Sequence, residues 1–494
     1  MTDSLGDKAA VGAIWSTIQT IAARLMGISA NLALAWLLTR EDFGLFGKAA
    51  TIAAFCEVFG AGGIGTILIV RKNKFHRWAE PAQWLGLSLG ITVSILMIVC
   101  GMVITLQPGT QRASELFVII SLMALTPLFR SFATVPYAKL RIDMRFKKIA
   151  VLETIMMLGS SIFKVALAFF GCGAFSFVIP TVATAFVRSA YFWKVSGVKF
   201  SRSLGLKRWK YLFDDGLMLI LTALLFKLVT YGDYAILTLF VSLEQLGVYF
   251  FAFTYSVMGV VMLTAGLNGV LVPTFASIEN KDRRNQAFVR SASLLLALVC
   301  PLCFLQSAVS EPAVNLLLKD TWQPAIILLQ ILSLGMAGRT ISWLAASLME
   351  SQRRFRTRFL LGIISAAIFL TIVLLGASTL GTLDVAIGVA IFFPIMSAGV
   401  TLVALNDSGN AVSLLGKIVF KPVISSAIAV FLPWMFFVYL SFSNVAQLIF
   451  IPSATIVIYT ILLRSWNQET YSELVSKLQT IFAKFRNSRL SHAK

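Results

Sequence analysis

The chain has 494 residues, of which 58% are hydrophobic and only 13% are charged, and its mean hydropathy is +0.85. A soluble domain needs far more charge on its surface, so this composition excludes a soluble globular protein. The formal net charge of +20 could suggest a nucleic-acid ligand, but the distribution of the basic residues argues against one.

Fourteen stretches are apolar and long enough, at about 20 residues, to cross a bilayer as helices. They cover residues 9–38, 43–69, 82–106, 114–139, 149–170, 173–194, 216–241, 246–277, 288–308, 323–349, 357–378, 381–405, 417–440 and 444–463. The chain is therefore predicted to be an all-α polytopic membrane protein with about 14 transmembrane helices. The apolar run 313–318 is too short to span and is expected to form a turn at the membrane interface.

Basic residues gather on one side of the predicted membrane. Of the 42 Lys and Arg residues, only Arg40, Arg112 and Lys319 lie in the loops that follow odd-numbered spans. By the positive-inside rule both termini are then cytoplasmic. The excess positive charge indicates this topology and attraction to an anionic leaflet, and no nucleic-acid partner is expected.

Two pairs of basic residues occupy matching places in the two halves of the chain. Arg24, at the middle of the first span, is followed 17 residues later by EDFG, and Lys227 in the seventh span is followed at the same distance by EQLG. Arg130 in the fourth span precedes RFK by 15 residues, and Arg339 in the tenth precedes RFR by 15. Because both pairs are six spans apart, the halves are predicted to be parallel repeats related by an axis along the membrane normal.

The repeat defines three predicted domains. Residues 1–200 form an N-terminal lobe with spans one to six. Residues 201–406 form a C-terminal lobe with spans seven to twelve, preceded by a basic cytoplasmic linker. Residues 407–494 contain spans thirteen and fourteen and a basic amphipathic cytoplasmic tail, in which apolar residues recur at helical spacing.

A cation at the centre of a bilayer costs roughly 3 to 15 kcal/mol on an isolated helix. Arg24 is about 22 Å from either end of its span, which is too far for its side chain to reach the interface. Thr17, Thr20, Gly27 and Asn31 share its helix face. We interpret this polar face as the lining of an aqueous, cationic cavity for an anion.

The candidate cavity residues are Arg24, Lys227, Arg130, Arg339, Lys48, Lys164 and Asn31. Glu57 and Asp233 are the most deeply placed carboxylates and are candidates for carrying a proton or holding Na⁺ during transport. The alternative is that these charges form internal ion pairs, such as Lys227 with Asp233 or Arg24 with Glu57.

Catalytic chemistry is poorly represented in the sequence. His76 and His492 fall in a cytoplasmic loop and in the tail, and the sequence contains no metal-ligand cluster, nucleophile–base pair or phosphate-binding loop. Cys300 and Cys303 are expected to act as small apolar packing residues. We therefore expect that the protein is not an enzyme and binds no cofactor or metal. Transport could be driven by coupling to an H⁺ or Na⁺ gradient.

Several stretches resemble the polysaccharide-exporter branch, of the colanic-acid-exporter type, of the multidrug/oligosaccharidyl-lipid/polysaccharide flippase superfamily. They are AVGAIWSTIQTIAARLMG with LAWLLTREDFGLFG, VPYAKLRIDMRFKKIAVLE, LVPTFASIENKDRR and KDTWQPAIILLQILSL. The resemblance implies two six-helix lobes facing each other in a V, with two further C-terminal helices. It also implies a cationic central cavity, and Arg24 and Lys227 are the residues that fit it.

The activity implied by the resemblance is translocation of undecaprenyl-pyrophosphate-linked oligosaccharide repeat units across a bacterial inner membrane for surface polysaccharide synthesis. Membrane lipids, a polysaccharide polymerase and a chain-length regulator are the partners expected beside this substrate. A pyrophosphate is a strong anion. Arg can donate two parallel hydrogen bonds to its oxygens, and Lys attracts it as a point charge.

Three alternatives remain open. A multidrug or cation antiporter of the same superfamily should have an acidic cavity, whereas basic residues predominate inside these spans. A peptidoglycan lipid-precursor flippase is a close relative of the first hypothesis. A membrane enzyme such as a glycan polymerase should carry a large outer loop with acid and base residues, and the predicted outer loops are very short.

Arg24→Ala is expected to abolish polysaccharide export while the protein level persists, because the variant loses the mid-membrane cation. Arg24→Lys should retain part of the export, since it keeps the charge but loses the fork geometry. Polysaccharide export is measured in cells in which each variant replaces the wild-type protein. Normal export by the Ala variant would contradict the assignment of Arg24 to the cavity.

Overall fold

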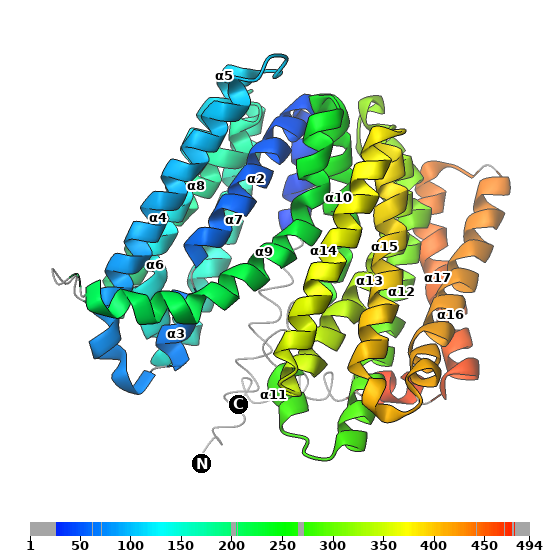
Figure 1. Ribbon diagram of the computed structural model, residues 1–494. Helices are drawn as coiled ribbons and strands as arrows, with labels where there is room; N and C mark the ends of the chain where they lie inside the picture. The colour runs from blue at the N-terminus through cyan, green and yellow to red at the C-terminus, as the bar shows by residue number, and fades with distance from the viewer. Residues whose placement is uncertain are drawn as a thin grey trace, which may run out of the picture. The chain divides into compact units, whose positions relative to one another are not determined.

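The computed structural model describes residues 26–61, 63–70, 72–198, 204, 206–264, 271–440, 442–468, 470–476 and 479. Regular structure in these residues is helical throughout (Figure 1). Thirteen helices in the described part of the chain are long and apolar enough to cross a membrane. Together with the helical fold, this confirms the predicted class of all-α polytopic membrane protein.

The long helices coincide with the predicted spans two to fourteen. In chain order the helices are α2 (Arg40–Ala61), α3 (Ile64–Val70), α4 (Phe75–Thr105), α5 (Ala113–Met123), α6 (Leu125–Ile142), α7 (Phe146–Phe169), α8 (Phe175–Ser196), α9 (Trp209–Phe240), α10 (Leu243–Thr264), α11 (Leu271–Ala276), α12 (Lys281–Leu317), α13 (Ala325–Ser351), α14 (Phe355–Ser378), α15 (Thr382–Ala404), α16 (Ala411–Tyr439) and α17 (Asn444–Trp466). The first predicted span lies partly outside the described residues, and its described part is the helix Met26–Leu37.

The prediction of an interfacial turn at residues 313–318 was wrong. α12 continues through Pro301 and Pro312 to Leu317 without a break. Its 37 residues extend over about 55 Å, whereas the hydrocarbon core is about 30 Å thick. The short apolar run is therefore the last part of a helix that is longer than the hydrocarbon core.

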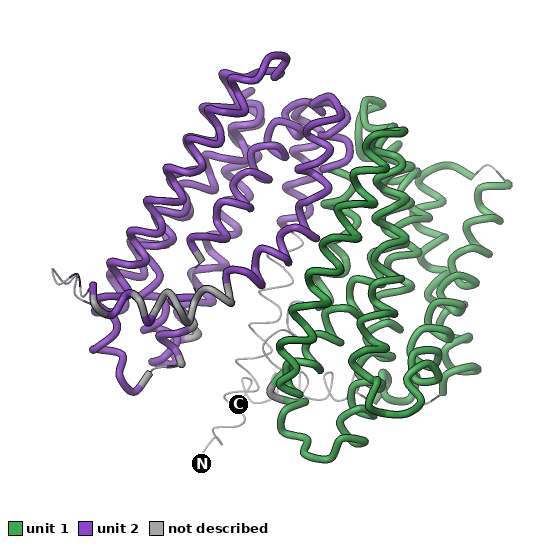
Figure 2. Tube along the Cα trace, viewed as in Figure 1, with its two compact units in different colours: residues 1–18, 251–494 green, residues 19–250 purple. Residues whose placement is uncertain are grey.

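The chain packs as two compact units, one of residues Gln19–Phe250 and one of residues Phe251–Lys494 together with Met1–Ile18 (Figure 2). The change from one to the other falls inside α10. The predicted domain boundaries at residues 200 and 406 describe the sequence repeat, and they stay a prediction, as does the arrangement of the lobes in a V.

Polar contacts fix the beginning of α2 in the first of these units. Thr39 and Asp42 cap the helix reciprocally. The backbone N–H of Thr39 donates to Oδ2 of Asp42 at 3.2 Å, and the backbone N–H of Asp42 donates to Oγ1 of Thr39, also at 3.2 Å. Arg112, just before α5, donates to Asp42 Oδ1 at 2.9 Å and also to Glu115. Partial burial alone would lower the pKa of Arg112, but these bonds, first to Glu115 and then to Asp42, raise it.

The motif glycines lie where α2 and the beginning of α10 meet. A Cβ atom on Gly44 would lie 1.9 Å from the carbonyl oxygen of Leu243, and one on Gly247 would lie 1.8 Å from that of Arg40. No side chain larger than hydrogen fits at either position without movement of the backbone. The final glycine of EDFG and that of EQLG therefore have the same local function, a close approach of two helix ends.

Two of the repeat motifs, RFK and RFR, have similar local geometry. Arg145 precedes α7 with φ −79° and ψ 43°, and Arg354 precedes α14 with φ −84° and ψ 49°. Nη1 of Arg145 donates to the carbonyl oxygen of Val195 at 3.2 Å, and Nη1 of Arg354 donates to that of Val403 at 3.1 Å. The RFK and RFR motifs thus begin two helices of 24 residues each and tie them to the ends of α8 and α15 in the same way.

In the second unit, α13 and α15 pack through small residues. A Cβ atom on Gly335 would lie 2.4 Å from Cα of Ala390, and one on Gly338 would lie 2.6 Å from the backbone nitrogen of Pro394. Close backbone approach of this kind is how membrane helices gain van der Waals contact without a hydrophobic driving force.

Gly338→Ala is expected to lower the free energy of unfolding by about 1–3 kcal/mol, because the added methyl group would push α13 and α15 apart. The measurement is the apparent melting temperature of the purified protein in detergent. Gly399→Ala is the matched control, since nothing lies within 4 Å of its Cβ position and alanine favours helix. Equal melting temperatures for the two variants would refute the packing argument.

Candidate functional site

Three residues predicted to lie in the cavity region come together in the unit Gln19–Phe250. Nη1 of Arg130, on α6, donates to both carboxylate oxygens of Glu57, on α2, at 2.9 Å each. Lys227, on α9, interacts electrostatically with both of them. We call these three residues the cationic cluster. With all three groups in their usual ionised forms, the cluster has two positive charges and one negative charge.

Each member of the cationic cluster is positioned by the packing of its helix. α2 packs against α9, which brings Glu57 and Lys227 to the same region. α6 begins at Leu125, and Arg130 follows Pro127 by one turn. Proline is tolerated in the first turn of a helix because the N–H that it lacks has no partner there. Arg130 therefore lies in the second turn of α6, close to this proline.

The cationic cluster is open on one side. The side chain of Arg130 is 51% exposed and that of Glu57 is 27% exposed. Both lie on helices that cross the membrane, and charged groups are far too costly to face hydrocarbon there. The open face of this ion pair is therefore best explained by a water-filled space.

Lys227 has an aromatic neighbour that sequence analysis missed. Its Nζ lies 4.7 Å from the ring centroid of Tyr231, one helical turn further along α9. The negative face of an aromatic ring attracts an ammonium group by about 0.5–2 kcal/mol. The i, i+4 spacing in the sequence was the available signal, because such residues are neighbours on a helix surface.

Asp233 has a different environment from Glu57. It is completely buried, and its Oδ2 accepts a hydrogen bond of 2.8 Å from the hydroxyl of Tyr249 on α10. Its Oδ1 accepts from the backbone N–H of Tyr234 at 2.9 Å. These contacts fix Asp233 to the packing of α9 on α10. No sequence pattern indicated Tyr249 as its partner.

Lys48 lines a separate cavity of about 580 Å³ in the same unit. The walls come from α2, the end of α4 and the loop after it, the end of α9 and the beginning of α10. Among its described lining residues Lys48 is the charged one. By the predicted topology this cavity is near the outer face of the membrane.

The other predicted residues lie elsewhere. Arg24 lies outside the described residues. Asn31 is half-buried in the helix Met26–Leu37, and Lys164 is half-buried in α7. Arg339 belongs to the other unit, where its guanidinium lies 5.4 Å from the ring centroid of Phe393. The structure thus brings Lys227, Arg130 and Glu57 together in one region, and the functional assignment of every candidate residue stays a prediction.

Tyr249→Phe is expected to destabilise the protein by about 2 kcal/mol, because the variant loses a hydrogen bond to a buried carboxylate. The readout is thermal unfolding of the purified protein in detergent. Tyr255→Phe, also on α10, is the control, since no hydrogen-bond partner of the buried Tyr255 hydroxyl is present in the described residues. If Tyr255→Phe loses as much stability as Tyr249→Phe, the hydrogen bond is not the cause.

Solved structures show the fold. The lipid II flippase MurJ is similar with a TM-score of 0.76, at 15% sequence identity, over 92% of this chain and 99% of that one. An inward-facing MATE multidrug resistance transporter of the MOP superfamily is similar with a TM-score of 0.57, at 15% identity, over 81% of this chain and 98% of that one. Identities this low establish the common fold alone.

Three curated relatives are similar in sequence. The succinoglycan biosynthesis transport protein ExoT of Rhizobium meliloti is 26% identical over 61% of each chain, so the match spans less than two thirds of that relative. The lipopolysaccharide biosynthesis protein WzxC of Escherichia coli is 23% identical over 78% of each chain. The teichuronic acid biosynthesis protein TuaB of Bacillus subtilis is 23% identical over 65% of this chain and 67% of its own length.

The names of these relatives agree with the family resemblance found in the sequence motifs, which is thereby confirmed. A family model for polysaccharide biosynthesis proteins matches residues 33–327, more than half of the chain. The protein is a multi-pass membrane protein that belongs to the polysaccharide biosynthesis protein family.

Proposed function

We propose that this protein is a flippase that moves polyprenyl-pyrophosphate-linked oligosaccharide repeat units across the bacterial inner membrane for the synthesis of a surface polysaccharide. The observation that carries the proposal is the cationic cluster, an open arrangement of Arg130, Lys227 and Glu57 within membrane-spanning helices. The transport and biosynthesis functions in the names of the three relatives support the same class of substrate.

The chemistry of the cationic cluster suits a pyrophosphate. Arg130 uses Nη1 for Glu57, and a guanidinium has five N–H donors, so others remain for phosphate oxygens. Lys227 adds three donors on a point charge. A pyrophosphate that binds here competes with Glu57 for Arg130. Binding therefore exchanges an internal ion pair for a pair with the substrate.

Glu57 is the stronger candidate of the two carboxylates for coupling to an ion gradient. It is partly exposed and borders the proposed substrate, whereas Asp233 is completely buried. Protonation of Glu57, or binding of Na⁺ to it, would release Arg130 for the pyrophosphate. In this proposal the movement of substrate follows from alternating access and needs no catalytic residue and no cofactor.

The alternatives make different demands on the site. A cation antiporter would have to bind a positive substrate beside Arg130 and Lys227, which repel it. A peptidoglycan-precursor flippase would use the same pyrophosphate chemistry, and the structural likeness to MurJ concerns the fold alone. The relatives therefore favour a polysaccharide repeat unit as the substrate.

The topology belongs to the same proposal. The distribution of the basic residues supports cytoplasmic termini, and in this proposal the substrate is loaded from the inner leaflet. A polysaccharide polymerase and a chain-length regulator would act on the product at the outer face.

Lys227→Gln and Arg130→Gln are each expected to slow flipping of a purified lipid-linked oligosaccharide about tenfold or more in proteoliposomes. Each variant loses a charge-assisted hydrogen bond worth about 1.5–3 kcal/mol. Lys227→Arg should keep most of the rate, because it keeps the charge.

Arg356→Gln is the control for this experiment, since it makes the same change of charge at an exposed position near the beginning of α14. The proposal fails if Lys227→Gln and Arg130→Gln transport at the wild-type rate. It also fails if Arg356→Gln slows transport to the same extent.

A further inference from the structure

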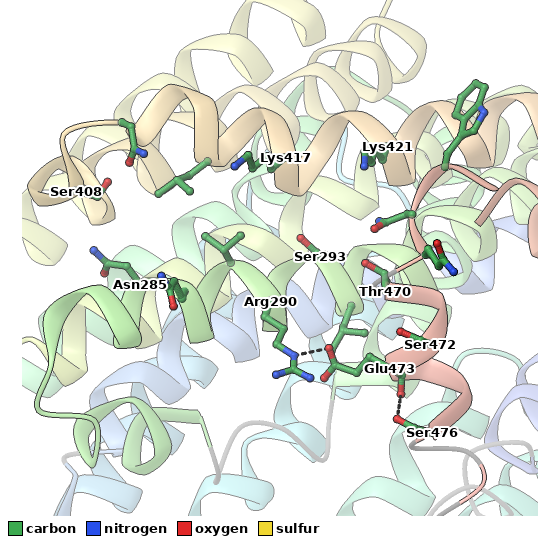
Figure 3. A pocket seen from close by; sticks show the side chains of 18 of the residues that line it. Asn285, Arg290, Ser293, Ser408, Lys417, Lys421, Thr470, Ser472, Glu473 and Ser476 are labelled. Carbon is green, nitrogen blue, oxygen red and sulfur yellow. Dashed lines mark hydrogen bonds and ion pairs between the residues drawn. The ribbon is translucent and has the colours of Figure 1, made fainter. Parts of the chain in front are cut away.

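The unit that contains α12, α16 and α17 holds a large polar cavity that none of the predicted site residues line. Its volume is about 1530 Å³, and it lies where α12 and α16 begin and α17 ends (Figure 3). Small-molecule sites commonly have volumes of about 300–1,000 Å³. The cavity thus has room for a sizeable polar group together with water.

The cavity is at the level of the membrane surface. α12, α16 and α17 are all long and apolar enough to cross the bilayer, and the cavity lies at one end of them. Trp466, the last residue of α17, is part of its wall, and tryptophan is enriched at membrane interfaces. Only 11% of the most apolar part of α17 is buried in the described protein, as expected for a helix that faces lipid. A lipid headgroup can therefore reach the cavity from the bilayer.

Two lysines give the cavity an uncompensated positive charge. Lys417 and Lys421 lie one turn apart on α16, and neither forms an ion pair within the described part of the chain. Arg290 on α12 is already paired, because its Nε lies 2.5 Å from Oε2 of Glu473. Asp282, which is exposed, is the other acidic residue of the wall. The two lysine ammonium groups are therefore available to an anion.

Asn285 has a hydrogen-bonding atom that none of the described residues satisfies. This residue of α12 is 4% exposed and lines the cavity, and its Oδ1 has no hydrogen-bond partner in the described part of the chain. A buried polar atom without a partner is costly. A hydroxyl group can donate to the side-chain oxygen of Asn or accept from its nitrogen. Ser293, Ser408 and Thr470 add further hydroxyl groups to the wall.

We propose that this cavity binds the headgroup of an anionic, hydroxyl-bearing phospholipid of the adjoining leaflet, for which phosphatidylglycerol is the simplest example. The phosphate interacts with Lys417 and Lys421, and the glycerol hydroxyls satisfy Asn285 and the neighbouring hydroxyl groups. By the predicted topology this is the inner leaflet, which is rich in such lipids. The lipid is a bound component of the protein and is distinct from the transported substrate.

The test is a titration of the purified full-length protein with phosphatidylglycerol, followed by native mass spectrometry. Lys417→Gln/Lys421→Gln is expected to weaken binding at least about tenfold, since each basic residue near an anionic headgroup contributes roughly fivefold. The control is Arg283→Gln/Arg356→Gln, which removes the same charge from exposed residues outside the cavity wall. Thermal unfolding of every variant checks that the fold is retained.

The hydroxyl contacts are tested with lipids of different headgroups. Asn285→Leu should reduce the preference for phosphatidylglycerol over phosphatidic acid, which lacks the glycerol headgroup, while binding of phosphatidic acid persists. Phosphatidylethanolamine should bind weakly to every variant, because its net charge is zero. Soluble glycerol 3-phosphate should not displace the lipid at equal concentration.

Equal loss of binding in the control double variant would overturn the proposal, because it would show a general effect of charge. Displacement by glycerol 3-phosphate would overturn the membrane-lipid assignment in favour of a soluble phosphate ligand. Displacement of phosphatidylglycerol by the lipid-linked oligosaccharide would show that the cavity binds substrate. A flippase assay that fails leaves these binding results unchanged, so the two proposals are tested separately.

Discussion

The cost of an unpaired charge inside a bilayer is the constraint on which the rest of the structure depends. Arg130 meets it through both oxygens of Glu57, and Asp233 through the hydroxyl of Tyr249 and a backbone N–H. The two solutions differ in their consequences. A buried carboxylate that is held by packing is suited to fixing helices, whereas a half-exposed ion pair can exchange its partner for a ligand.

The same constraint governs the backbone. Helices that cross a membrane satisfy their own hydrogen bonds, so irregular backbone is confined to the ends of the spans and to places where protein covers it. Arg145 and Arg354 each donate to a carbonyl group at the end of another helix, Val195 in α8 and Val403 in α15. The residues that precede these two helices thus have similar dihedral angles and equivalent hydrogen bonds, which is what duplication of one structural unit predicts.

We propose two separate functions for positive charge in this protein. Within the spans, Arg130 and Lys227 leave a net positive charge beside Glu57, where a pyrophosphate can take the place of the internal carboxylate. At one end of the helices, Lys417 and Lys421 line a polar cavity, which is the proposed site of a lipid headgroup. The first set is suited to transient binding in a transport cycle, and the second is suited to a lipid that stays bound.

Sequence by itself indicated the helical class and the approximate positions of the spans, because about twenty apolar residues can satisfy the bilayer only as a helix. It also indicated the repeat and the charged residues within the spans, since each is a local pattern. Only the tertiary structure decided that Glu57 pairs with Arg130, that Tyr249 holds Asp233, and that α12 continues past Pro312. It also decided that Arg290, Lys417 and Glu473 border one cavity. Contacts between residues so distant in the chain depend on helix packing and rotation, which hydropathy and spacing do not encode.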